Sequence, residues 1–413
     1  DDRLNPLEVT EEAFMDMVMK KPVSIAKALY SSFTGLSPLL ASEICHRSSI
    51  DGDMPVDSLD DDGKKHLFNN LTWIADDVKN HTYRPNIIFR GKEPIDFSCI
   101  ELTQFSDYEA KNFDSISQVL EEYYASRNVY TRIRQKSVDL RKIVSTALDR
   151  NRKKYQLQEK QLKDTEKRDK YKVYGELIHT YGYGLEEGAK KLEALNYYTN
   201  EMITIPLDSQ LDAKGNAQKY FDRYNKLKRT YEALTKLTEE TKTEIEHLES
   251  ISTALDIALT EDDLVQIKEE LIEFGYIKRK KTDKKARIKS KPFHYRSSDG
   301  YDIYVGKNNY QNDELTFKFA TGNDWWFHAK GMPGSHVIVK SNNEELPDRV
   351  FEEAGMLAGY YSKGREDEKV EIDYLQKKNV KKPNGAAPGF VVYYTNYSLT
   401  IHPDISGLTL VSD

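Results

Sequence analysis

Apolar side chains recur every seven residues over a long stretch of the chain's second half. One set comprises Leu227, Leu234, Thr241, Leu248 and Leu255. A second set, four residues further on each time, comprises Tyr231, Thr238, Ile245, Ser252 and Leu259. The hydroxyl residues make the seam imperfect, but spacing that holds over five heptads is typical of a coiled coil. The pattern predicts a long helix within residues 223–285.

A second helical stretch, residues 114–172, precedes it, with Ile133, Leu140 and Ala147 at the same spacing. The heptads are interrupted over residues 173–222, where glycines and Pro206 are frequent and residues 202–205 are β-branched or apolar. Glycine and proline end regular helices. We therefore expect an antiparallel coiled-coil hairpin that carries a small folded tip with a short strand.

The N-terminal 80 residues predict short helices. The segment 29–48 contains a turn at Gly35, and Ser37 with the following proline starts the next helix, as in a helix-hairpin-helix. Backbone N–H groups at such a helix start can hold a phosphate, so Gly35 and Ser37 are candidate phosphate contacts. The alternative is an ordinary helical hairpin that packs on a neighbouring element.

Residues 81–113 predict two short strands around a turn at Gly91. A lone hairpin is barely stable in water, so we expect it to complete the sheet of a domain missing from the N-terminus.

Residues 292–413 predict a compact α+β domain. Two strands are expected within 293–306, on either side of a turn at 298–300, and further strands at 314–320, 324–330, 335–340, 371–376, 389–395 and 397–403, where β-branched and aromatic residues are enriched. A helix with a small apolar face is expected at 347–361. The predicted fold class is thus multidomain α and α+β: a helix-hairpin-helix region, a long coiled-coil arm with a tip, and this C-terminal domain.

The composition agrees with long solvated helices. Charged residues make up 31% of the 413 residues, the hydrophobic set only 38%, and the mean hydropathy is −0.71. No apolar run approaches the roughly 18 residues that span a bilayer, so membrane insertion is not expected. Two cysteines, Cys45 and Cys99, exclude a disulfide scaffold and a four-cysteine zinc site. They favour a reducing, cytoplasmic location, and the acidic N-terminal residues do not resemble a secretory signal.

Positive charge is concentrated on one of the two predicted arm helices. Although the net charge is −7, residues 127–172 contain 16 Lys/Arg and 6 Asp/Glu, whereas residues 223–285 contain 13 and 14. Such an excess favours a phosphate-rich partner, while the alternative is a merely solvated helix face. The candidate RNA-binding residues of the arm are Arg127, Arg132, Arg134, Lys136, Arg150, Arg152, Lys153 and Lys154.

A second candidate surface lies in the C-terminal domain. Trp325 and Trp326 form an aromatic pair, and Lys377, Lys378, Lys381 and Lys382 cluster in a loop rich in proline and glycine. Aromatic rings stack on unpaired bases and lysines pair with phosphates, which is the chemistry of single-stranded RNA binding. Alternate aromatics on a strand can instead face a core.

No catalytic constellation emerges from the sequence. His328, His336 and Asp324 make a metal site conceivable, but their spacing matches no known ligand pattern. Ser335 and His336 are neighbours on a strand, point to opposite faces and cannot form a nucleophile–base pair. Phosphate-binding glycine loops and dinucleotide motifs are absent from the sequence. We therefore expect a binding protein rather than an enzyme, with no catalytic residue, metal or cofactor.

The segments NDWWFHAKGMPGSHVIV and DYLQKKNVKKPNGAAPGFVVYYTNYSLTIHP resemble the C-terminal domain of the NFACT family. IPLDSQLDAKGNAQKYFDRYNKLKR is similar to its coiled-coil and tip region, and FTGLSPLLASEICHR to its helix-hairpin-helix. The resemblance covers essentially the whole chain. The family's N-terminal domain carries an Asp–Arg pair for tRNA recruitment. Asp2 and Arg3 lie outside the context of that motif, so the role is not assigned to them, and the N-terminal domain is expected to be missing.

The resemblance implies a factor that binds large ribosomal subunits obstructed by peptidyl-tRNA. It would contact ribosomal RNA, recruit alanyl-tRNA and direct untemplated alanine tailing of the nascent chain, with the chemistry left to the ribosome. Other family members are named as fibronectin/fibrinogen-binding adhesins. A surface protein that binds host fibronectin or fibrinogen is therefore the alternative, although the sequence shows no wall-sorting tail.

Overall fold

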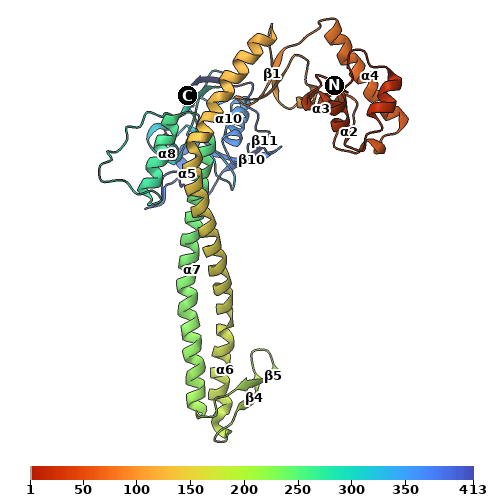
Figure 1. Ribbon diagram of the computed structural model, residues 1–413. Coiled ribbons are helices and arrows are strands. Elements are labelled where there is room, and N and C mark those ends of the chain that lie inside the picture. The colour runs from red at the N-terminus through yellow and green to blue at the C-terminus, as the bar shows by residue number, and fades with distance from the viewer. Residues whose placement is uncertain (1) are drawn as a thin grey trace. The chain divides into compact units, whose positions relative to one another are not determined.

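A computed structural model describes residues 2–413. The chain divides into two compact units, the first comprising the residues up to Lys136 together with 404–408, and the second comprising 137–403 together with 409–413. The helices, the C-terminal sheet domain and the chain termini can be located in Figure 1.

The first unit begins with short helices around one apolar core. They are α1 (Glu11–Ala13), η1 (Phe14–Val18), α2 (Ile25–Ser32), α3 (Pro38–Arg47), η2 (Val56–Ser58) and α4 (Asp61–Lys79). Phe14, Leu29, Phe33, Ile44 and Leu71 are among the residues that fill this core. The helices start at side-chain caps, since Ser24, Ser37 and Asp60 each accept a backbone N–H of the following turn.

A three-stranded antiparallel sheet follows, in the order β2-β1-β3. Its strands are β1 (Asn86–Arg90), β2 (Glu93–Ser98) and β3 (Glu109–Asn112), with η3 (Thr103–Phe105) before the last. Ile87 packs on Val119 and Tyr123 from the start of α5 (Ile116–Asp164). The sequence predicted two strands. It missed β3 because its four residues, EAKN, are all exposed and include no β-branched or aromatic side chain.

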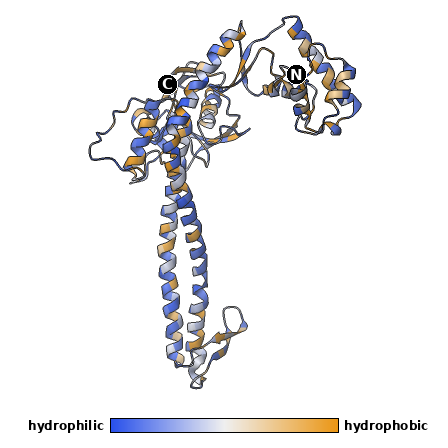
Figure 2. Cartoon of the chain, viewed as in Figure 1, coloured by the Kyte–Doolittle hydropathy of each residue, from blue (hydrophilic) through white to orange (hydrophobic). Residues whose placement is uncertain are grey.

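In the second unit, long helices run side by side as an arm. The first side consists of the rest of α5, η4 (Thr165–Lys167) and α6 (Arg168–Tyr181), and the other side is α7 (Ala213–Ile257). Arg168 lies 4.2 Å from the ring centre of Tyr231, and Arg223 lies 4.4 Å from that of Tyr171, so the two sides are antiparallel. Figure 2 shows a mainly hydrophilic arm with a few hydrophobic positions along it.

The end of the arm carries a small folded tip. After η5 (Gly182–Gly184), β4 (Lys191–Asn196) and β5 (Glu201–Pro206) pair antiparallel. Their inward residues join Leu177, Ile178 and Ala217 of the flanking helices in one apolar cluster. Gly175 allows Phe221 of α7 to lie against the backbone of α6, since a Cβ there would be 2.8 Å from the ring.

The helix α7 ends earlier than the heptad pattern suggested. A capping box between Thr260 and Asp263 starts a new helix, α8 (Glu261–Glu273), and residues 278–292 contain no regular helix. The stretch 223–285 therefore contains two helices instead of one, because the side chains of Thr260 and Asp263 accept the free backbone N–H groups at the beginning of α8.

The C-terminal domain is a seven-stranded antiparallel sheet in the order β11-β10-β8-β9-β7-β6-β12. The strands are β6 (Phe293–Arg296), β7 (Asp302–Val305), β8 (Trp325–Ala329), β9 (Val337–Val339), β10 (Val370–Gln376), β11 (Tyr397–Ile401) and β12 (Thr409–Ser412). Helix α10 (Asp348–Tyr360) packs on the sheet through buried Val350, Ala354 and Leu357. The remaining short helices are α9 (Asn309–Glu314), η6 (Leu315–Phe319) and η7 (Lys377–Asn379).

Two segments of this domain differ from their predicted strands. Residues 315–319 are helical, since Asn308 caps α9 by accepting the Gln311 N–H and η6 continues the same helix. Residues 389–395 form no strand, and only Val392 pairs, with Lys381. In both, the residues resemble a strand in type, but they differ in burial: Leu315 is 4% exposed, whereas Tyr394 is 88% exposed.

We expect Gly175→Ala to destabilise the tip. The added methyl group would push the Phe221 ring out of place, and overfilling a packed site costs about 1–3 kcal/mol, more than the roughly 1 kcal/mol that alanine gains in a helix. Hydrogen exchange of β4 and β5 amides should therefore accelerate. Gly184→Ala is the matched control, because open space surrounds that position. Equal exchange in both variants would contradict this account.

Candidate nucleic-acid interface

Basic residues of the arm helix occur in both units, and those of the first unit have partners within the chain. Arg127 hydrogen bonds to the Tyr123 hydroxyl and lies over its ring. Arg134 forms a 2.9 Å ion pair with Glu93. Arg132 and Lys136 also interact with other groups of the chain. All four side chains are nevertheless exposed.

The basic run of the second unit is more open. Arg152 forms a 3.0 Å ion pair with Glu249 of α7, while Arg150, Lys153 and Lys154 are exposed and form no ion pair within residues 2–413. Residues 137–172 contain 12 Lys/Arg and 6 Asp/Glu, whereas α7 contains 8 of each. The excess of positive charge that the sequence showed therefore belongs to one side of the two-sided arm.

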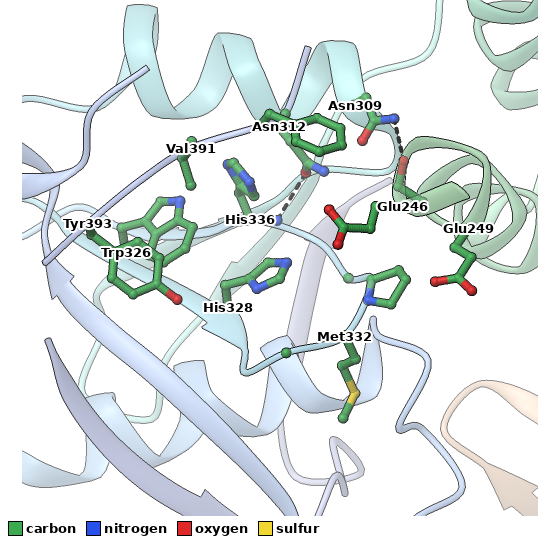
Figure 3. Close-up of a pocket in the computed structure, with 16 residues that line it drawn as sticks. Glu246, Glu249, Asn309, Asn312, Trp326, His328, Met332, His336, Val391 and Tyr393 are labelled. Carbon is green, nitrogen blue, oxygen red and sulfur yellow. Dashed lines mark hydrogen bonds between the residues drawn. The ribbon is translucent and has the colours of Figure 1, made fainter. Parts of the chain in front are cut away.

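A cavity of about 470 Å³ opens where the arm meets the C-terminal domain (Figure 3). Its walls come from α7, α9, β8, the loop after β8 and the segment 389–393. The lining residues are Glu246, Glu249, Ser250, Asn309, Asn312, Trp326, His328, Gly331, Met332, Pro333, Gly334, His336, Gly389, Phe390, Val391 and Tyr393. The cavity thus joins aromatic and apolar walls to carboxylates that α7 contributes.

Two imidazoles form part of this wall. The Nδ1 of His336 lies 2.7 Å from the Thr316 hydroxyl, and its backbone N–H donates to Asn312 Oδ1 at 3.0 Å. His328 is half-buried and stacks on Trp326 with ring centres 5.6 Å apart. Burial lowers the pKa of both imidazoles, and His328 and Lys382 lower that of His336 further. Both rings are therefore neutral at pH 7.

The structure brings two separately predicted basic segments to this cavity. Arg152 forms an ion pair with Glu249, and Glu249 lines the mouth of the cavity. From the other side, Lys382 pairs with Asp313, whose carboxylate also accepts the Gly389 N–H at 3.1 Å. Lys381 pairs through its backbone with Val392, which lies between two lining residues.

Lys377 and Lys378 lie elsewhere in the domain, beyond the start of β8. Their backbone N–H groups donate to the carbonyls of Asp324 and Gly322, at 2.8 and 3.2 Å. Neither side chain forms an ion pair in the described part of the chain. They are separate from the cavity, and RNA contact by them stays a prediction.

The predicted aromatic surface is wrong for Trp326, which is only 1% exposed. It lies on the inner side of β8, where it packs on Ile338 and Leu375. Trp325 is half-buried against Phe351, with ring centres 4.9 Å apart. The sequence also placed Tyr393 among aromatic residues of a predicted strand, and the structure puts it in the cavity lining without that strand. Phe390, the other ring of this segment, was not singled out.

The metal site and the serine–histidine pair considered from the sequence are not formed by the described residues. Asp324 is held by Lys340 at 2.6 Å and by the Ser341 N–H at 3.0 Å, away from His328 and His336. Ser335 is buried, and its hydroxyl has no hydrogen-bond partner among the described residues, so it forms no pair with His336. Within residues 2–413, no group of three or more potential metal-ligating side chains is brought together.

At the helical hairpin of the first unit, Gly35 has a φ of +77° and Ser37 caps α3 through a 3.2 Å bond from the Leu40 N–H. Both residues are exposed. The geometry suits the predicted turn, and phosphate contact there stays a prediction. None of the helices within residues 2–413 combines the length and the apolar character that crossing a bilayer requires.

These features define a class of protein: a domain with an aromatic and polar cavity, attached to a long two-sided arm whose positive charge is on one side. Family profiles identify it further. A profile described as the NFACT N-terminal and middle domains matches residues 1–290, and one described as the NFACT protein RNA binding domain matches residues 291–394. The chain belongs to the NFACT family. The expectation that its N-terminal domain is missing is therefore not borne out.

Curated relatives match along nearly the whole chain. A Bacillus subtilis protein named Rqc2 homolog RqcH is 34% identical over 98% of this chain and 69% of its own length. A Streptococcus suis protein of the same name is 36% identical over 97% and 67%. Among solved structures, the C-terminal part of the fibronectin/fibrinogen-binding protein of Streptococcus suis is 40% identical, with a TM-score of 0.53, over 66% of this chain and 96% of its own.

Lowering the pH should destabilise the C-terminal domain around β8 and β9. Unfolded histidine protonates near pH 6.5, whereas burial lowers the folded pKa of His328 and His336 below that value. The unfolded state thus binds more protons, and stability present above pH 6.5 is lost as the pH falls through the folded pKa. Hydrogen exchange of residues 325–339 should accelerate between pH 7 and 5.5, after correction for intrinsic rates. His336→Gln should weaken this dependence, and imidazole NMR titration at or above 6.5 would contradict it.

Proposed function

We propose that this protein is an RNA-binding factor of ribosome-associated quality control that works in the cytoplasm. The observation that carries the proposal is the one-sided positive charge of the arm, 12 Lys/Arg against 6 Asp/Glu on residues 137–172 and a balanced α7 opposite. Helix α7 cannot neutralise this excess positive charge, because its own acidic and basic residues are equal in number. It is therefore available to phosphates, and the release of their counterions favours association.

Two further observations support this partner. The C-terminal domain matches the family's RNA binding domain, and curated relatives over nearly the whole chain are named Rqc2 homologs. By this relationship we infer the finer function: the protein binds large ribosomal subunits obstructed by peptidyl-tRNA, recruits tRNA and directs untemplated alanine tailing. The arm's role is to bind and position RNA, while peptide-bond chemistry is left to the ribosome.

A second candidate function is adhesion to host fibronectin or fibrinogen. It is favoured by the name of the solved Streptococcus suis structure. The two candidates differ in their physical signature, because RNA binding through phosphates weakens steeply with salt, whereas association through a largely apolar protein interface does not.

The triple charge reversal Arg150→Glu, Lys153→Glu and Lys154→Glu should weaken binding to large ribosomal subunits at least tenfold. These side chains are exposed and form no ion pair within residues 2–413, so the arm should keep its helicity. Arg152 is left unchanged because its reversal would also break the ion pair with Glu249. Co-sedimentation in sucrose gradients measures binding, and circular dichroism measures helicity.

The matched control reverses Lys228, Lys236 and Lys242, three exposed lysines of α7, and changes the net charge equally. It should retain more of the binding, because it lies on the charge-balanced side of the arm. Equal losses in the two variants, or no loss in the first, would contradict a role for the basic side.

The affinity for ribosomal RNA should also fall by orders of magnitude between low and moderate salt. Each phosphate contact contributes about −0.7 to −0.9 to the slope of log affinity against log salt concentration. The slope for the triple variant should therefore be shallower by about 2–3 than that of the unchanged protein. Fluorescence anisotropy with a labelled RNA fragment at several salt concentrations gives both slopes, and salt-independent binding would favour the adhesion alternative instead.

A further inference from the structure

The cavity between α7 and the C-terminal sheet suggests a recognition element beyond general phosphate binding. We propose that it holds one unpaired nucleobase of a bound RNA strand, with guanine as the base that its polar groups fit best. This proposal rests on the RNA binding proposed above and assigns the position at which the base, rather than the phosphate backbone, is read.

The walls of the cavity suit a flat ring. Phe390, Tyr393 and His328 are half-buried, so each ring keeps a part open to the cavity. Behind them lies Trp326, 5.2 Å from the Tyr393 ring and 5.6 Å from that of His328. Aromatic side chains, histidine rings included, stack on unpaired bases.

The position of the rings is fixed from outside the cavity. The Tyr393 hydroxyl donates to the buried Asp373 carboxylate at 2.7 Å, so the ring's edge is held. The backbone of His336 is held by Asn312. Rings held in this way lose little conformational entropy when a ligand enters, which is the property of a preformed binding site.

The polar groups favour guanine among the four bases. Glu246 is exposed, forms no ion pair within residues 2–413, and its carboxylate points into the cavity in Figure 3. A carboxylate only accepts hydrogen bonds. Guanine presents two adjacent donors, N1–H and N2–H, to one such group, whereas uracil presents a single N–H between two carbonyl oxygens. Glu249, the other carboxylate of the mouth, is instead paired with Arg152.

The charges around the mouth agree with entry of a base rather than a phosphate. A phosphate would be repelled by Glu246, but the basic run 150–154 approaches from the Glu249 side and Lys381 and Lys382 from the other. A strand that places its phosphates on these two segments has the cavity between them. The negative group at the mouth and the positive groups at its flanks therefore select the part of the nucleotide that enters.

The test uses the full chain and three RNA strands of nine nucleotides that lack every base except the central one, which is guanine, uracil or also absent. Because the other positions cannot stack, sliding cannot place another base in the cavity. Fluorescence anisotropy at fixed salt should give an affinity for the guanine strand at least 5-fold above that for the baseless strand, since stacking contributes about 1 kcal/mol or more per base. The uracil strand should lie between them.

Two variants locate the effect. Val391→Trp fills the cavity and should abolish the difference between the guanine and baseless strands, with baseless-strand affinity unchanged. Glu246→Gln should reduce the preference for guanine over uracil while raising baseless-strand affinity, because a negative charge is removed. Glu240→Gln, exposed on α7 and outside the lining, should preserve the preference while matching the change in charge.

The outcomes separate the two proposals. Binding of all three strands with equal affinity overturns the nucleobase site while RNA binding stands. A uracil strand that binds more tightly than the guanine strand overturns the assignment of guanine. Binding of none of them, together with no binding of ribosomal RNA, overturns the proposed function itself. A guanine preference that survives both Val391→Trp and Glu246→Gln overturns the placement in this cavity.

Discussion

The arrangement of the second unit depends on buried polar contacts that join the base of the arm to the C-terminal domain. The carboxylate of Glu270, 1% exposed, accepts two bonds from the Asn309 amide and lies 3.3 Å from His247 of α7. Beside it, Lys307 and Asp263 form an ion pair that is almost entirely buried. Removing one partner of such a pair lowers the free energy of unfolding by about 3–5 kcal/mol, because the remaining charge is buried with neither a partner nor water to compensate it.

These contacts also determine which residues line the cavity. Asp263 closes the capping box that ends the arm and starts α8, and it also binds Lys307 and Ser290. Asn309 bonds to Ser250 of α7 as well as to Glu270. The last turns of α7 are therefore held at one rotation about their axis, with Glu246, Glu249 and Ser250 toward the C-terminal domain. Apolar contacts alone would fix this rotation less strictly, because they are not directional.

The sequence predicted the elements whose periodicity is strong and not those that tertiary contacts decide. Heptads located both sides of the arm, since a long repeat gives the same signal many times. Residues 315–319 resembled a strand but are helical, because the cap at Asn308 starts a helix that continues through them. Trp326 was predicted at a surface because a strand's pattern does not tell which face is covered. The cavity could not be predicted from the sequence, since its walls come from segments up to about 150 residues apart.

The distribution of charge in the second unit follows from the same arrangement. Burial lowers the pKa of both cavity imidazoles, so they are neutral at pH 7, and the charged lining groups Glu246 and Glu249 lie on the arm. Arg152 neutralises one of these carboxylates, and the remaining basic residues stay on the outside. Positive charge is therefore exposed along the arm, whereas the charged groups that line the cavity are negative. Because attraction to phosphates is independent of sequence, a site that is to distinguish bases must exclude phosphates, and in the proposed nucleobase site Glu246 at the mouth would have this role.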